Sequence, residues 1–243
     1  MKQKLPELLR VIEFDIGFIQ MSWDPVWESI FSSRPWGRYP AEPLIRFVAR
    51  HFYDLDRKDI HILELGCGPG ANLWFCAREG FSVYGVDGSS SGIEICRCRL
   101  DLEVPDWQGE LHLGDVTSLP FSSDRFDAII DNECICCLSW EDAKAAYLEA
   151  HRVLRKNGRL FVRTFADGSA GQATGQPAGR NACYCTEGPL RDKGLARFTS
   201  RDDIAELLPS ELFALDSLEQ MQWSVEDMRL WVKEWLIDSI CLK

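Results

Sequence analysis

The amino-acid sequence predicts an α/β fold built on a mostly parallel sheet. From residue 60 onward, short apolar segments alternate with longer segments of helical periodicity, as expected for successive βαβ units. The first apolar segment runs directly into a glycine-rich turn. An unusually aromatic stretch precedes this alternation. We therefore expect residues 1–56 to form an N-terminal helical cap and residues 57–243 to form the core.

The expected elements follow one another along the core. The apolar runs predict strands at 60–65, 82–86, 110–113, 126–130 and 159–164. Residues 166–199 break the alternation, because their first half is glycine-rich and polar, and a long loop in a compact domain is commonly functional. Near the C-terminus, Trp231, Val232 and Trp235 repeat with helical spacing, so periodicity alone favours a helix there.

The N-terminal segment has two interpretations. Glu42 to Tyr53 predicts a helix with one apolar stripe, and a turn-rich loop at 33–40 precedes it. Its many aromatic residues either pack on the core as a plain cap or form a lid over a binding site.

Composition and charge narrow the function classes. The chain has 243 residues and a formal net charge of -11, and we find no basic stripe, so no nucleic-acid partner is expected. No apolar run approaches the length of a membrane span, so no membrane partner is expected either. Cysteines in predicted core strands and helices indicate reduced thiols in a cytoplasmic protein.

Two clusters among the ten cysteines could either bind a metal or pack as buried side chains. Cys134, Cys136 and Cys137 lie close together, and Cys183 and Cys185 follow in the later loop. Four thiolates could bind zinc, but the second pair lacks the usual two-residue spacer. Another interpretation is that the thiols form a pocket that binds a soft metalloid for methylation. We favour small buried apolar residues and expect no metal site.

The most informative motif runs from Ile62 to Gly70. An apolar strand ends in Glu64-Leu65 and enters a loop with glycines at 66, 68 and 70. Glycine adopts positive φ and lets a ligand approach the backbone, and a helix that starts after such a loop offers free N–H groups. About twenty residues later a second strand ends in Asp87, where a carboxylate can accept both hydroxyls of a ribose. The motif predicts a nucleoside-containing cofactor.

Two cofactor classes fit this loop: a dinucleotide and S-adenosylmethionine (SAM). Further motifs separate them, namely Glu64 before the first glycine, Gly114-Asp115-Val116 after the third strand, the run from Arg125 to Asp131, and the run from His151 to Leu160. Taken in this order, the chain resembles the class I SAM-dependent methyltransferases, in particular the small-molecule branch called type 11. The match is close from about Ile60 to Arg163.

The resemblance implies both a fold and a set of cofactor residues. The fold would be a Rossmann-like, doubly wound, mostly parallel seven-stranded sheet with an N-terminal helical cap, closed by an antiparallel strand near Val232 to Cys241. Position by position, it places the methionine part of SAM, the ribose and the adenine beside the following residues. They are Glu64, Gly66, Cys67, Gly68 and Gly70 for methionine, Asp87 and Gly88 for ribose, and Asp115 and Val116 for adenine. In the cap loop, Arg34, Arg38 and Tyr39 are candidates to bind the cofactor carboxylate or an anionic substrate.

The acceptor site is expected beyond the fourth strand, because ligands of open α/β sheets bind outside the carboxyl ends of the strands. Asp131 and Glu133 are therefore candidates to orient or deprotonate the acceptor. The expected activity is methyl transfer to an oxygen or nitrogen of a small metabolite or sugar derivative, by a monomer or homodimer. The alternatives are a protein or tRNA methyltransferase, a metalloid methyltransferase, and a SAM-binding pseudoenzyme.

Overall fold

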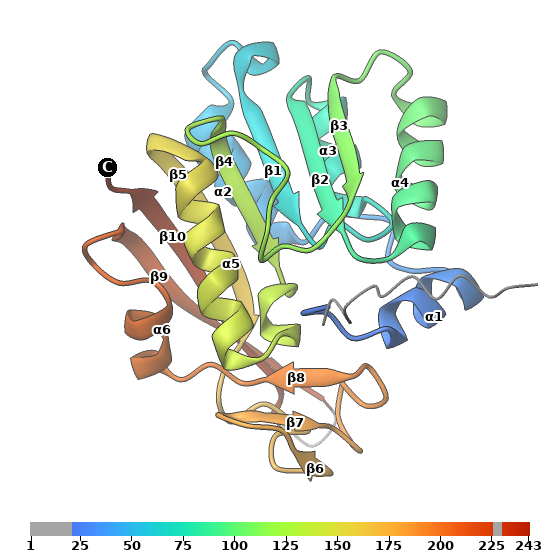
Figure 1. The fold of residues 1–243 in the computed structure, drawn as a ribbon, viewed down its shortest axis with the longest axis vertical. Coiled ribbons are helices and arrows are strands. Elements are labelled where there is room, and N and C mark those ends of the chain that lie inside the picture. The colour runs from blue at the N-terminus through green and yellow to red at the C-terminus, as the bar shows by residue number, and fades with distance from the viewer. Residues whose placement is uncertain (1–20, 226–229) are drawn as a thin grey trace, which may run out of the picture.

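The computed structural model describes residues 21–225 and 230–243 (Figure 1). The two short 3-10 turns are η1 (Arg57–Asp59) and η2 (Ile135–Cys137). The helices are α1 (Val26–Ser33), α2 (Glu42–Phe52), α3 (Ala71–Arg78), α4 (Ser90–Glu103), α5 (Trp140–Val153) and α6 (Arg201–Leu207). The strands are β1 (His61–Leu65), β2 (Ser82–Asp87), β3 (Gly109–Leu113), β4 (Phe126–Asn132), β5 (Leu154–Phe165), β6 (Gln176–Pro177), β7 (Ala182–Tyr184), β8 (Leu195–Arg197), β9 (Phe213–Ser224) and β10 (Leu230–Cys241).

The main sheet has seven strands in the order β3-β2-β1-β4-β5-β10-β9. The first five pair in parallel, whereas β10 is antiparallel to both β5 and β9. This order reverses direction at β1, which leaves a crevice outside the carboxyl ends of β1 and β4. The predicted doubly wound, mostly parallel seven-stranded sheet is confirmed.

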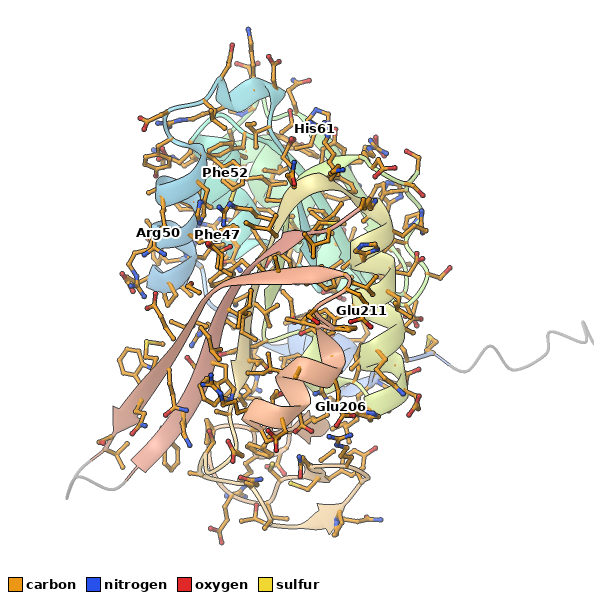
Figure 2. The ribbon with its side chains drawn as sticks, turned by 90° about the vertical axis from the view of Figure 1, so that its left-hand side faces the viewer. Phe47, Arg50, Phe52, His61, Glu206 and Glu211 are labelled. Carbon is orange, nitrogen blue, oxygen red and sulfur yellow. The ribbon has the colours of Figure 1, made fainter. Side chains whose placement is uncertain are left out.

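Helices cover both faces of the sheet, as apolar residues on both sides of its central strands require. On one face, α2, α3 and α4 pack on alternate residues such as Ile62 and Ile130. On the other face, α5 and α6 pack on residues such as Leu63 and Ile129. Figure 2 shows α2 with Phe47 and Phe52 turned toward the sheet and Arg50 on the opposite side.

The C-terminal segment resolves the conflict between periodicity and resemblance. Residues 230–241 form strand β10, which pairs along most of its length with both neighbours. The strand near Val232 to Cys241 is therefore confirmed, and the helix favoured by periodicity is wrong over this range. Its apolar residues occur at both helical and strand spacing, and burial between two strands decided the outcome.

The two segments outside the regular alternation lie at the carboxyl edge of the sheet. Helix α1 lies beneath the lower end of α4, where α4 begins after β2 (Figure 1). The expected loop at 166–199 contains a small antiparallel sheet, β6-β7-β8, at the same end. Residues 1–20 of the expected cap lie outside the described residues, so the boundary at residue 56 stays a prediction. In the described part of the chain, no helix has the length and apolar character needed to span a membrane.

Candidate active site

A cavity of about 300 Å³ opens at the carboxyl ends of β1, β2, β4 and β5. The glycine loop and the residues after β4 both line the cavity. The segment from Ser22 to Ala41 forms a cover with aromatic side chains. We call residues 22–41 the lid. The sequence-predicted glycine loop, the end of β4 and part of the aromatic segment thus meet around one space.

The glycine loop adopts the backbone conformation that its glycines permit. Gly66, Gly68 and Gly70 have φ of 64°, 46° and 78°, which residues with a side chain rarely adopt. A Cβ on Gly66 would overlap the Sγ of Cys134 after β4. Helix α3 begins at Ala71 directly after the loop, so its free N–H groups face the cavity wall. Cys67, between two of these glycines, also lines the cavity.

Glu64 lies at the end of β1 with its carboxylate at the cavity wall. Its side chain is buried, and Oε1 accepts a hydrogen bond of 2.6 Å from the Asn72 amide. Oε2 is also buried, and it has no hydrogen-bond partner among the described residues. Burial raises the pKa of Glu64 to about 8. Such a carboxylate offers an unused acceptor to a cationic group of a ligand.

Asp87 ends β2 and also lines the cavity. Its carboxylate accepts hydrogen bonds of 2.7 Å from the backbone N–H groups of Gly68 and Ser89. These bonds tie the glycine loop to β2, while burial raises the pKa of Asp87. An ionised carboxylate has about four acceptor positions, so two amides leave room for ribose hydroxyls. Gly88 lines the cavity beside it, and a Cβ there would overlap the Trp23 ring.

The residues predicted for the adenine lie after β3. Gly114 and Val116 line the cavity. Asp115 is not among the lining residues, because its carboxylate accepts hydrogen bonds from Ser22 and from Thr117. In this structure Asp115 therefore holds the start of the lid.

Arg38 and Tyr39 differ in their placement. Tyr39 lines the cavity. The side chain of Arg38 is 64% exposed and forms an ion pair of 2.6 Å with Glu103 on α4. Of these two residues, only Tyr39 reaches the cavity wall in this structure.

The lid carries functional candidates that sequence reasoning did not single out. Trp27, Phe31 and Trp36 line the cavity and contact one another with ring centroids 5.7–5.8 Å apart. Glu28 on α1 accepts hydrogen bonds from Ser89 and Ser91 at the start of α4. The density of aromatic residues was the available signal for the lid. The hydrogen bonds between α1 and the start of α4 could not be predicted from the sequence.

The two predicted acceptor-site carboxylates have different environments. Asp131 is fully buried and accepts hydrogen bonds from the N–H groups of Cys134 and Ile135 and from the Tyr147 hydroxyl. Asp131 is not among the residues that line the cavity, and it holds the turn η2 in place. Glu133 does line the cavity, in a left-handed backbone conformation with φ 62°.

Glu133 forms part of a charge cluster that the sequence did not reveal. Arg163 on β5 lines the cavity 3.1 Å from Glu133, and Glu234 on β10 binds the same guanidinium at 2.7 and 2.8 Å. Burial raises the pKa of Glu133 to about 7, while the charge of Arg163 opposes this shift and Glu234 adds to it. Arg163 and Glu234 come together through the pairing of strands β5 and β10 in the sheet. Since the sequence did not reveal this pairing in register, neither Arg163 nor Glu234 was a candidate.

The cysteine clusters meet around a buried apolar site. Cys136, Cys137, Cys183 and Cys185 belong to one hydrophobic cluster with residues such as Phe198. Within the described ranges, donor atoms close enough to share a metal ion occur at His51, Asp216 and Asp238 and not at these thiols. Arg159 already pairs with both of those aspartates, at 2.8 and 3.0 Å.

A family model described as "Methyltransferase domain" matches residues 62–158. This range contains the glycine loop, Asp87, Asp115 and the end of β4. Over this range the chain is similar to methyltransferase domains.

Named relatives and solved structures of methyltransferases agree with this similarity. A methyltransferase of Streptomyces halstedii, GfsG, is 31% identical over 50% of this chain and 44% of its own length. A SAM-dependent methyltransferase of Methanosarcina mazei has the same fold, with a TM-score of 0.65, 18% identity, and coverage of 76% of this chain and 93% of that one. This chain spans about half or less of the length of the curated relatives it matches.

A third comparison concerns a neighbour with ligands. The 1,6-didemethyltoxoflavin-N1-methyltransferase of Burkholderia thailandensis was solved with bound 1,6-didemethyltoxoflavin and S-adenosylhomocysteine (SAH). Its TM-score is 0.61 at 16% identity, covering 83% of this chain and 78% of that one. SAH is the product that SAM becomes after it has given up its methyl group, so the neighbour's site is a SAM site. The unpartnered Glu64 Oε2 and the open acceptor positions of Asp87 fit the ammonium and ribose of that cofactor.

Proposed function

We propose that this methyltransferase moves a methyl group from SAM to an oxygen or nitrogen of a small molecule. The observation that carries the proposal is one cavity lined by cofactor-type residues, by Glu133 and by residues of the lid. Alignment of the acceptor and exclusion of water are what such a transfer mainly requires.

The residues that line the cavity would have separate tasks. Bound SAM would supply an electrophilic methyl group on its sulfonium. Glu64 and Asp87 would hold the ammonium and the ribose, and Val116 would lie beside the adenine. Glu133 would accept the proton of a hydroxyl or ammonium acceptor. A base with a pKa of about 7 is well matched to proton transfer at neutral pH.

Size and charge support a small acceptor. A cavity of about 300 Å³ lies at the lower end of the range for small-molecule sites. The net charge of -11 disfavours a nucleic-acid acceptor. The neighbour from Burkholderia thailandensis, with a small heterocycle and SAH bound, supports the same class. All ten cysteines are unbridged, which supports a cytoplasmic location as part of this proposal.

Two experiments test the proposal. Calorimetric titration should show binding of SAH and no binding of NADH. Incubation with [methyl-³H]SAM and fractionated small metabolites should then label a low-molecular-weight product. Label that appears only in added protein or tRNA would contradict the small-molecule class. An NADH isotherm without one for SAH would contradict the cofactor.

A further inference from the structure

Two cations lie beside Trp36, outside the set of residues that line the cavity. The Lys193 Nζ lies 5.3 Å from the centroid of the Trp36 ring, and the Arg34 Cζ lies 6.0 Å from it. Trp36 itself lines the cavity. Neither cation has a carboxylate within 4.0 Å among the described residues, whereas the nearby Arg163 has two.

The carboxylates near this site are already engaged. Glu234 holds Arg163 through two hydrogen bonds, and Glu133 shares the same guanidinium. Asp24 lines the cavity, but its oxygens accept hydrogen bonds from the N–H groups of Val26 and Leu195 at 3.0 and 3.3 Å. Among the described residues, Lys193 and Arg34 thus have no carboxylate within 4.0 Å, and Asp24 has no cation within that distance.

Lys193 is held in this place by the lid. It precedes Gly194, which has φ 78°, and a Cβ on Gly194 would lie 2.5 Å from the Asp24 carboxylate. Lys193 is half-buried, and burial lowers its pKa, with the charge of Glu133 opposing this shift. A partly desolvated ammonium gains more from an anionic ligand than an exposed one does.

We propose that the methyl acceptor carries a carboxylate, which binds Lys193 with Arg34 at the rim, and an apolar or aromatic body, which packs against Trp27, Phe31 and Trp36. This inference rests on the proposed function, because it takes Glu64, Asp87 and the glycine loop to hold SAM. A carboxylate supplies one negative charge where the structure leaves cations unpaired. An amine acceptor would add a further cation beside Lys193 and Arg34.

The test uses matched probes on the intact protein. Each of three rings, benzene, indole and naphthalene, is used as the acetic acid, the corresponding acetamide and the corresponding ethylamine. Affinities are measured by calorimetry and ligand-observed NMR, with and without saturating SAH. For at least one ring, the acid should bind at least about tenfold more tightly than the amide and the amine, as expected for a charge-assisted hydrogen bond.

Variants assign the preference to Lys193. Lys193→Met keeps the apolar stem and should reduce the preference for the acid to under about threefold, and Lys193→Arg should retain most of it. Arg191→Met is the matched control, because Arg191 lies in the same segment and, among the described residues, pairs only with Asp192. This variant should keep the full preference.

The outcomes separate this inference from the proposed function. An equal or better affinity for the amine, or a preference that survives in Lys193→Met, overturns the carboxylate acceptor. So does SAH binding with no acid bound. A protein that fails to bind SAH at all contradicts the proposed function instead.

Discussion

Asp115 accepts two hydrogen bonds from Ser22, one of 2.9 Å from the backbone N–H and one of 2.6 Å from the hydroxyl. Resemblance assigns Asp115 to the adenine, while the structure makes it the anchor of the lid. The two roles are compatible, because Gly114 and Val116 on either side of it line the cavity. Lid position and adenine binding are therefore expected to be linked through this carboxylate.

The first prediction concerns this link. Ser22→Ala removes one of the two hydrogen bonds, so residues 22–39 should exchange amide hydrogens faster in the free protein, with SAH affinity within about threefold of wild type. Asp115→Ala should speed exchange similarly and weaken SAH binding at least about tenfold, since a hydrogen bond to a charged group is worth roughly 1.5–3 kcal/mol. If Asp115→Ala leaves SAH affinity unchanged, Asp115 anchors the lid only.

The second prediction concerns Asp87. Asp87→Ala removes the acceptor of the ribose hydroxyls and should weaken SAH binding at least about tenfold in calorimetry. Asp127→Ala is the matched control, because that carboxylate also accepts a backbone N–H, from His61, but lies outside the cavity. Both variants should lower Tm, and only Asp87→Ala should lose SAH affinity. An equal loss in both would mean that the fold and not a ligand contact is responsible.

The third prediction concerns the protonation of Glu64. With its pKa raised to about 8, the free protein holds this carboxyl mostly protonated at pH 7. The ammonium of bound SAH would lower that pKa, so binding should release a proton. Calorimetry at pH 7 in buffers of different ionisation enthalpy measures this release, and Glu64→Gln should abolish it.

The same group affects stability in the free protein. Between about pH 4.5 and 8 the folded protein binds a proton that the unfolded chain has lost, so this group makes stability fall as pH rises through that window. Glu64→Gln should flatten this part of the profile in chemical denaturation. An unchanged slope in the variant would show that another group causes it.

The fourth prediction separates Glu133 from Asp131. Glu133→Gln should lower kcat by roughly 100-fold or more for an acceptor that must lose a proton. In wild type, kcat should rise with pH to a plateau above about 7, because the base acts deprotonated and its pKa is about 7. Asp131→Asn removes a hydrogen-bond acceptor from the turn η2, so it should lower Tm. The rise of kcat with pH should persist in this variant. If kcat still rises with pH in Glu133→Gln, a residue other than Glu133 is the base.

Local sequence determined much of this site. The glycines at 66, 68 and 70 predicted a turn that only positive φ allows, and the alternation of apolar segments predicted the order of strands. Asp87 was predictable because the end of a strand places its side chain at the carboxyl edge of a parallel sheet. These features depend on neighbours within a few residues, or on one rule of sheet topology.

Contacts between distant segments were decided only by the tertiary structure. Arg163 and Glu234 meet because β10 pairs antiparallel with β5, and periodicity alone favoured a helix at that end. Asp115 holds Ser22 across 93 residues, and Lys193 reaches Trp36 through the contact between Gly194 and the lid. The sequence by itself thus determined the strand-and-loop framework of a SAM-binding fold. Which charges surround the acceptor depended on strand register and lid packing, because those bring together side chains that no local pattern relates.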